Sequence, residues 1–195
     1  MSSSTEHPTP AAVRFRVAAY DDPQSVRFVD ALQQFYRERY GGADRTPVRP
    51  DEFAPPYGLF LLGDLPDEPG TAVCCGGWRR HDTASIASAD AGILRAGDAE
   101  VKRMWVDPAH RRRGLARAVL AELEATAQRA GCLRIVLETG DQQPEATALY
   151  VAAGYQRIPS FGVYRAEAGS DCFARDLTER SFPGAPVRRA SSSGG

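Results

Sequence analysis

Residues 99–131 read AEVKRMWVDPAHRRRGLARAVLAELEATAQRAG. The apolar run over 99–106 predicts a strand, and apolar residues four apart from Leu115 onward predict a helix that ends at Gly131. A helix N-terminus leaves backbone N–H groups without partners and carries partial positive charge, so it attracts anions. Gly114 removes a side chain where a phosphate would approach the backbone. The junction therefore predicts a pyrophosphate site, to which charge is added by Arg112, Arg113 and Arg117.

Almost all basic residues of the chain are arginine, since Lys102 is the sole lysine. A second interpretation of the junction is therefore that an arginine-rich chain places three arginines at a solvated helix start without a ligand. The junction has neither the G-x-x-x-x-G-K-S/T pattern of a Walker loop nor the G-x-G-x-x-G pattern of a dinucleotide-binding fold. Those two kinds of phosphate site are therefore excluded.

The segments on either side predict a mixed α/β sheet flanked by helices. LRIVLE, residues 133–138, is nearly all apolar, which indicates an interior strand covered on both faces. We expect a domain over 13–176 between disordered tails at 1–12 and 177–195. Further strands are predicted at 13–20, 58–63, 71–80, 155–158 and 171–177, and helices from Asp22-Pro23 to Gly41-Gly42 and from Gln143-Pro144 to Gly154.

Composition excludes several classes of protein. The chain has 195 residues with a formal net charge of −1, whereas general nucleic-acid binders are strongly basic. No apolar run approaches the roughly 18 residues of a membrane span, and the first residues lack a signal-peptide pattern. The four cysteines form no C-x-x-C pair, and a count of only three histidines argues against a metal site. We expect a reduced, cytoplasmic protein without nucleic-acid or membrane partners.

Three ordered segments carry a family resemblance. Residues 111–116, RRRGLA, match the Gln/Arg-x-x-Gly-x-Gly/Ala signature, and MWVDP at 104–108 is the usual lead-in. LETGDQQPEATALYVAAGY, residues 137–155, includes the closing A-L-Y-x-x-x-G-Y/F pattern. The chain thus resembles the GCN5-related N-acetyltransferase (GNAT) superfamily, specifically over 99–158 and more weakly over 13–98. Many relatives carry glycine where this chain has Ala116, a change that leaves the backbone amides available.

The resemblance implies the acyl-CoA N-acyltransferase fold, with a mixed sheet of about six to seven strands. The strands at 99–106 and 133–138 would be parallel and diverge at their C-terminal ends, and the gap would admit the pantetheine arm of acetyl-CoA. Val106 N–H would face the thioester oxygen, where negative charge develops. Gln143 would touch the cofactor or cap the helix begun by Pro144. The implied cofactor-binding backbone belongs to Met104, Trp105, Val106, Arg112, Arg113, Gly114, Leu115, Ala116 and Arg117.

Acyl transfer to an amine needs a base for the ammonium proton and an acid for the departing thiolate. By resemblance Tyr150 is the general acid; otherwise it is an aromatic residue packed on the sheet. The base is Glu100 or Glu138, either of which could instead pair with an arginine nearby in sequence, Arg103 or Arg134. Strict alternation would place Glu100 on one face with Lys102, Met104 and Val106.

These residues predict an N-acetyltransferase that uses acetyl-CoA as co-substrate, needs no metal, and acts on a small amine such as an amino acid, a polyamine or an aminoglycoside. One alternative is a protein N-terminal or lysine acetyltransferase, with an acceptor groove formed by 41–57, 82–98 and 159–170. Another is a non-catalytic acyl-CoA-binding sensor or partner protein. The resemblance also allows a homodimer.

Overall fold

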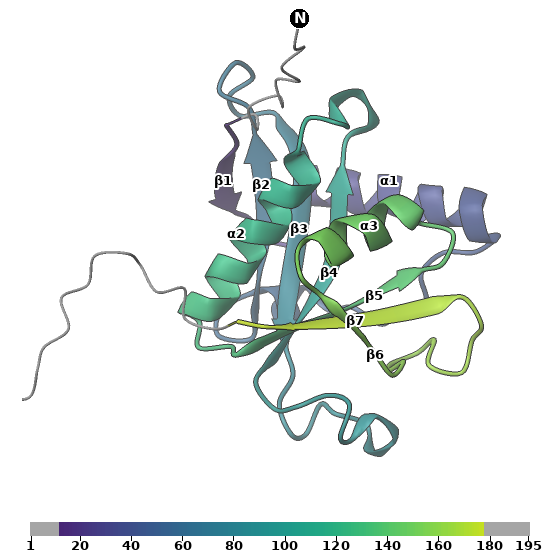
Figure 1. Cartoon of the computed structure of the whole chain (residues 1–195). Helices are drawn as coiled ribbons and strands as arrows, with labels where there is room; N and C mark the ends of the chain where they lie inside the picture. Colours follow the sequence, from purple (N-terminus) through teal and green to yellow (C-terminus); the bar gives the residue numbers. More distant parts are fainter. Residues whose placement is uncertain (1–11, 178–195) are drawn as a thin grey trace, which may run out of the picture.

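The computed structural model describes residues 12–177, and a seven-stranded sheet forms its centre (Figure 1). The tails predicted over 1–12 and 177–195 lie outside the described residues, except for positions 12 and 177. The strands are β1 (Arg14–Val17), β2 (Gly58–Asp64), β3 (Ala72–Arg80), β4 (Asp98–Val106), β5 (Arg134–Gly140), β6 (Gln156–Ile158) and β7 (Ser170–Asp176). The helices are α1 (Pro23–Tyr40), α2 (Leu115–Arg129) and α3 (Pro144–Ala152), with short 3-10 turns at Pro50–Phe53, Ser88–Asp90 and Pro108–His110.

The sheet order is β1-β2-β3-β4-β5-β7-β6. Neighbouring strands are antiparallel except for β4 and β5, which are parallel. One apolar cluster packs α2 and α3 on one face of the sheet, and a second packs α1 on the other (Figure 1). The predicted mixed α/β fold is confirmed. Among the helices of residues 12–177, none combines the length and apolarity that a membrane crossing needs.

The predicted ends of α1 follow from local chemistry. The Asp22 carboxylate accepts the Gln24 N–H at 2.8 Å, and Pro23 occupies the first turn, where no N–H is needed. Gly41 ends the helix with a φ of 76°, a left-handed conformation that glycine adopts without strain. The C-terminal half of α1 lies against β4, where the Phe35 ring packs on Trp105 with ring centroids 5.3 Å apart.

β5 is covered on both faces, as its apolar sequence predicted. Ile135 and Leu137 enter the cluster beneath α2, whereas Val136 packs with Phe161 on the other face. This burial fixes the central strand from which Glu138 projects.

A bulge in β4 corrects one expectation. Arg103 has a φ of 57°, and Arg103 and Met104 together lie opposite the single residue Gly76 of β3. The extra residue shifts the alternation of side chains. Met104 and Val106 therefore pack on the α2 face, while Lys102 lies with Glu100 on the other face, so strict alternation was wrong beyond Lys102.

Candidate active site

The candidate site lies where β4 and β5 separate. Their parallel pairing runs only from Asp98–Arg134 to Val101–Leu137, although β4 continues to Val106 and β5 to Gly140. This geometry confirms the predicted divergence. A cavity of about 1330 Å³ occupies the opening and is bounded by α1, both strands, the start of α2 and the start of α3.

Most of the predicted site residues line this cavity. Glu100 and Arg113 do not, and no residue of the 82–98 connection contributes to the wall. The predicted residues found in the wall are Met104, Trp105, Val106, Arg112, Gly114, Leu115, Ala116, Arg117, Glu138, Gln143 and Tyr150.

At one end of the cavity, α2 presents its N-terminus. Gly114 precedes the helix with a φ of 78°, and Arg112 is also left-handed, with a φ of 63°. The first intrahelical bond runs from Ala118 N to Gly114 O at 3.1 Å. The preceding N–H groups have no intrahelical acceptor and are free to bind an anion.

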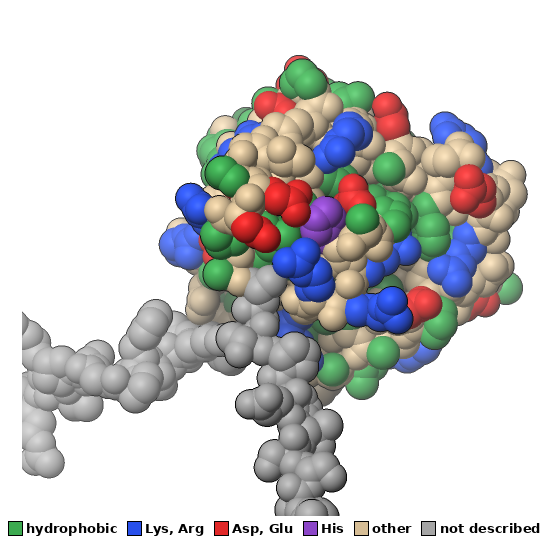
Figure 2. All heavy atoms as spheres, turned by 90° about the horizontal axis from the view of Figure 1, so that it is seen from above, with side chains coloured by type: hydrophobic (Ala, Val, Ile, Leu, Met, Phe, Trp, Pro, Cys, Tyr) green, Lys and Arg blue, Asp and Glu red, His purple; other side chains and the backbone are tan. Residues whose placement is uncertain are grey.

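Arginine side chains surround this end. The guanidinium groups of Arg112, Arg113 and Arg117 are exposed and form no ion pair with a carboxylate of residues 12–177. Arg111 instead lies over the Trp105 ring at 4.6 Å. Figure 2 looks down on this end of the molecule and shows basic side chains interspersed with acidic and hydrophobic ones. The three exposed guanidinium groups therefore add positive charge beside the start of α2.

Tyr150 projects from α3 beneath the cavity. Its side chain is 7% exposed, and its ring packs 5.8 Å from Tyr155 and 6.0 Å from Phe173. Burial raises the pKa of Tyr150 to about 12. Within residues 12–177 its hydroxyl has no hydrogen-bond partner, so the group is a protonated donor that remains uncommitted.

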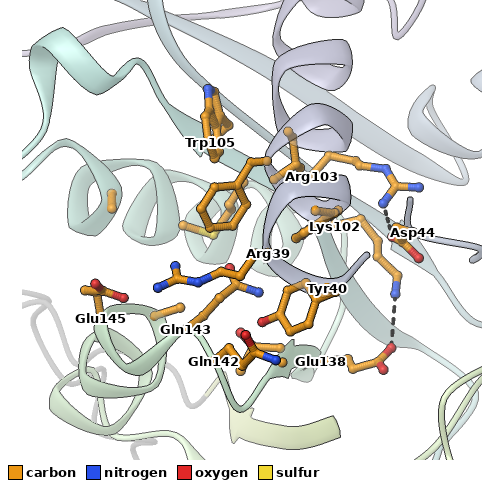
Figure 3. A pocket seen from close by; sticks show the side chains of 18 of the residues that line it. Arg39, Tyr40, Asp44, Lys102, Arg103, Trp105, Glu138, Gln142, Gln143 and Glu145 are labelled. Atoms are coloured by element: carbon orange, nitrogen blue, oxygen red, sulfur yellow. Dashed lines mark hydrogen bonds and ion pairs between the residues drawn. The ribbon is translucent and has the colours of Figure 1, made fainter. Parts of the chain in front are cut away.

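Glu138 extends from the end of β5 into the wall of the cavity (Figure 3). Ser170 Oγ donates to Glu138 Oε1 at 2.7 Å, and Lys102 Nζ lies 3.7 Å from Oε2. Burial raises the pKa of Glu138, and Lys102 and the Ser170 hydrogen bond offset only part of that effect. A carboxylate with a raised pKa is suited to accepting a proton.

Glu100 is the less suitable base. Its side chain is 3% exposed and contacts Arg79 Nε at 2.8 Å, His81 Nε2 at 3.1 Å and Lys102 Nζ at 2.8 Å. Burial alone would raise the pKa of Glu100, but Lys102, the His81 hydrogen bond and Arg79 outweigh it and hold the pKa well below its usual range. Glu100 does pair with an arginine, but the partner is Arg79 of the neighbouring strand β3 rather than Arg103 or Arg134.

Gln143 precedes α3 but makes no side-chain capping bond. Its amide instead lies near the Tyr40 hydroxyl, which reaches from the end of α1 toward the β5–α3 loop (Figure 3). Gly140 leaves the space that this hydroxyl occupies, since an added Cβ would overlap it. Gln143 thus faces the cavity rather than the turn of its own helix.

Several wall residues were not predicted as site residues. Tyr164 Oη donates to Asp44 Oδ1 at 3.0 Å, and Arg45 pairs with Glu167, so the loop after α1 joins the loop before β7. Asp44 also pairs with Arg103 (Figure 3). The two contacts between the loops join residues 120 and 122 positions apart, the Asp44–Arg103 pair joins residues 59 apart, and no local pattern signals any of them. In residues 12–177 no three His, Cys, Asp or Glu side chains gather as a metal site requires.

Known proteins share this architecture. The model of the acetyltransferase (GNAT) family matches residues 26–155. An "IAA acetyltransferase" of Azospirillum brasilense is 30% identical over 139 residues, covering 71% of this chain and 81% of that protein. An uncharacterised protein of Mycobacterium leprae is 36% identical over 142 residues, 66% of this chain, which spans only 38% of that longer protein. The crystal structure of a Klebsiella pneumoniae protein assigned as an acyl-CoA N-acyltransferase superposes with a TM-score of 0.64 at 28% identity, covering 85% of this chain and 98% of that one.

Proposed function

The chain belongs to the acetyltransferase (GNAT) family and is an acyltransferase, and from this premise we propose that it transfers an acetyl group from acetyl-CoA directly to the amine of a small molecule. The observation that carries the proposal is the single cavity wall that holds the start of α2, Glu138 and Tyr150. The anion-binding start of α2 and two side chains that can transfer protons therefore line the same cavity.

The residues present fit a CoA thioester. The unpartnered N–H groups of Leu115, Ala116 and Arg117 suit a diphosphate, and the unpaired arginines add charge beside them. The unpaired edges of β4 beyond Val101 and of β5 beyond Leu137 leave backbone groups that an extended, amide-bearing arm can bond. When bound, acetyl-CoA supplies a thioester carbon to which the amine nitrogen bonds as the C–S bond breaks.

The chain's own residues then move two protons. Glu138 accepts the proton that the amine nitrogen loses, directly or through water, and Tyr150 donates its hydroxyl proton to the departing thiolate sulfur. Glu138 is preferred to Glu100 because it lines the cavity, whereas the oxygens of Glu100 are occupied by three cationic or imidazole partners. Val106 N–H is the proposed donor to the thioester oxygen.

The enclosure of the acceptor side supports a small amine rather than a polypeptide. Tyr164 bonded to Asp44 and Arg45 paired with Glu167 bridge the loop after α1 and the loop before β7. A polypeptide would need an open groove between these loops. The acceptor is therefore proposed to enter as a compact molecule.

The test is thiol release from acetyl-CoA with a panel of amines, amino acids, polyamines and aminoglycosides, beside lysine-containing peptides. We expect turnover with a small amine, reduced about 10²–10⁴-fold in Glu138→Gln. Glu122→Gln is the matched control, because Glu122 is a partly exposed residue of α2, paired with Arg129 and outside the cavity wall. Turnover confined to peptides would refute the acceptor class, and thermal stabilisation by CoA without any turnover would favour a binding protein.

A further inference from the structure

The one lysine of the chain lies in the active site. Every other residue that contributes to the count of 24 Lys and Arg is arginine, and Lys102 is only 8% exposed at the base of the cavity. Lysine carries a compact point charge, whereas arginine spreads its charge over a planar group with five donors. The position thus holds a single localised charge between two strands.

Lys102 Nζ is placed between two carboxylates. It lies 2.8 Å from Glu100 Oε1 and 3.7 Å from Glu138 Oε2 (Figure 3). Glu100 is itself held from the other side, because Arg79 Nε and His81 Nε2 both contact its Oε2, at 2.8 and 3.1 Å. The ammonium group is therefore anchored by a carboxylate that cannot turn away from it.

The second carboxylate is less fully bonded than the first. Ser170 Oγ occupies Glu138 Oε1 at 2.7 Å, but 3.7 Å is too long for a hydrogen bond between Lys102 Nζ and Oε2. Lys102 acts on Oε2 through its charge alone. Glu138 Oε2 keeps an open site for a proton, which a base needs.

We infer that Lys102 is a positioning residue for acetyl transfer: anchored by Glu100, its ammonium group places a positive charge beside Glu138 and favours the carboxylate form of that side chain at the cavity wall. This inference rests on the proposed function, which makes Glu138 the base. Lys102 touches neither reacting atom in this role and acts through Glu138.

The charges that face Glu138 predict opposite effects for two substitutions. Lys102 and Ser170 lower the pKa of Glu138, whereas Glu100 and Asp44 raise it, Asp44 being paired with Arg103 on the loop after α1. Lys102→Met removes the nearby positive charge, so the pKa of Glu138 rises. Glu100→Gln removes a repelling negative charge and frees Lys102 from a competing partner, so the pKa of Glu138 falls.

The single lysine makes a direct test possible without any acceptor. The full chain, expressed with [ε-13C]lysine and no lysine-containing tag, has one labelled side chain, whose resonance is followed from about pH 4 to pH 9, a range chosen to bracket a carboxyl whose pKa is raised. We expect a titration step that disappears in Glu138→Gln and moves to lower pH in Glu100→Gln, with Glu122→Gln indistinguishable from wild type. Superimposable curves for wild type and Glu138→Gln would overturn the inference.

The kinetic test uses whichever amine the acceptor panel identifies. Glu138 must be unprotonated to act, so the acidic limb of kcat/KM should move up by about 1–3 pH units in Lys102→Met and down in Glu100→Gln. Lys102→Arg, which keeps the charge, should return the limb toward wild type. The acceptor's own ionisation is common to all variants and cancels in the comparison.

If the role of Lys102 is purely structural, Lys102→Met and Glu100→Gln will both lower kcat and leave the acidic limb of the kcat/KM profile at its wild-type pH. That result would overturn the inference. The absence of turnover with every amine would instead overturn the proposed function. Because the NMR titration needs no acceptor, the two failures are distinguishable.

Discussion

Tyr150 and Tyr155 allow the catalytic and structural uses of a buried hydroxyl to be separated. Their ring centroids lie 5.8 Å apart, and the two residues are 7% and 4% exposed. Tyr155 Oη donates to Glu124 Oε1 at 3.0 Å, whereas the Tyr150 hydroxyl has no partner within residues 12–177. Replacing each by phenylalanine should therefore have opposite consequences.

The magnitudes follow from these contacts. A hydrogen bond to a charged group contributes about 1.5–3 kcal/mol. Glu124 retains Arg175 Nη1 at 2.8 and 2.9 Å after Tyr155→Phe, so we expect a loss near the lower limit, about 1.5 kcal/mol, or roughly 3–6 °C in Tm. Tyr150→Phe removes a buried hydroxyl that bonds nothing, so stability should be unchanged or rise by up to about 1 kcal/mol. Its kcat should nevertheless fall about 10²–10⁴-fold, because the thiolate loses its acid.

Chemical denaturation tests the predicted stabilities, and steady-state thiol release on the same preparations tests the predicted kcat values. With burial holding the pKa of Tyr150 at about 12, the acid is fully protonated near neutral pH, so the kcat of Tyr150→Phe should be low throughout that range. Equal destabilisation of the two variants would refute the assignment of an unpartnered hydroxyl to Tyr150. Full activity of Tyr150→Phe, or a comparable loss in Tyr155→Phe, would refute its catalytic role.

Three further substitutions test the structure at separate places. Gly114→Val forces a branched residue into a φ of 78° over the amides at the start of α2, so calorimetry should show CoA affinity at least about 10-fold weaker; an unchanged Kd would contradict the diphosphate site. Gly58→Ala places a Cβ 2.1 and 2.4 Å from two backbone carbonyl oxygens, so urea unfolding should show a loss of about 3 kcal/mol or more in the free energy of unfolding. The control Gly42→Ala, whose Cβ would have nothing within 4 Å, should lose under about 1 kcal/mol. Similar losses in the two variants would contradict the close packing at Gly58. The Arg134 side chain is 9% exposed, and its Nε donates to the Asp98 carboxylate at 2.9 Å. Asp98→Ala removes that carboxylate and should lower the free energy of unfolding by about 3–5 kcal/mol. A loss below about 1 kcal/mol would show the pair to be solvated.

The elements that could be predicted from the sequence are those specified by neighbouring residues. Asp22, Pro23 and Gly41 determine the ends of α1 through bonds and backbone angles within a few positions. The RRRGLA junction, residues 111–116, likewise spans the turn before α2 and the first residues of that helix, so its place at the cavity end followed from the order of elements.

The remaining features depend on contacts that no local pattern encodes. The bulge at Arg103 occurs at a residue that gives no glycine or proline signal, and it reverses the faces of Met104 and Val106. Choosing between Glu100 and Glu138 required knowing that Arg79 and His81 arrive from β3 and the segment after it. A single sequence identifies such residues as candidates, but only the pairing of distant strands separates their roles.

The solitary lysine has a chemical consequence for an enzyme that handles a reactive thioester. Acyl groups pass spontaneously from thioesters to unprotonated side-chain amines, and the surface of this chain offers no lysine to receive them, because Lys102 is buried between carboxylates that keep it an ammonium ion. Prolonged incubation of the native chain with acetyl-CoA should leave no acetyl-lysine detectable by mass spectrometry, and denaturation at alkaline pH before incubation should reveal one modified site. The enzyme would thereby be protected from lysine acylation by the proposed co-substrate.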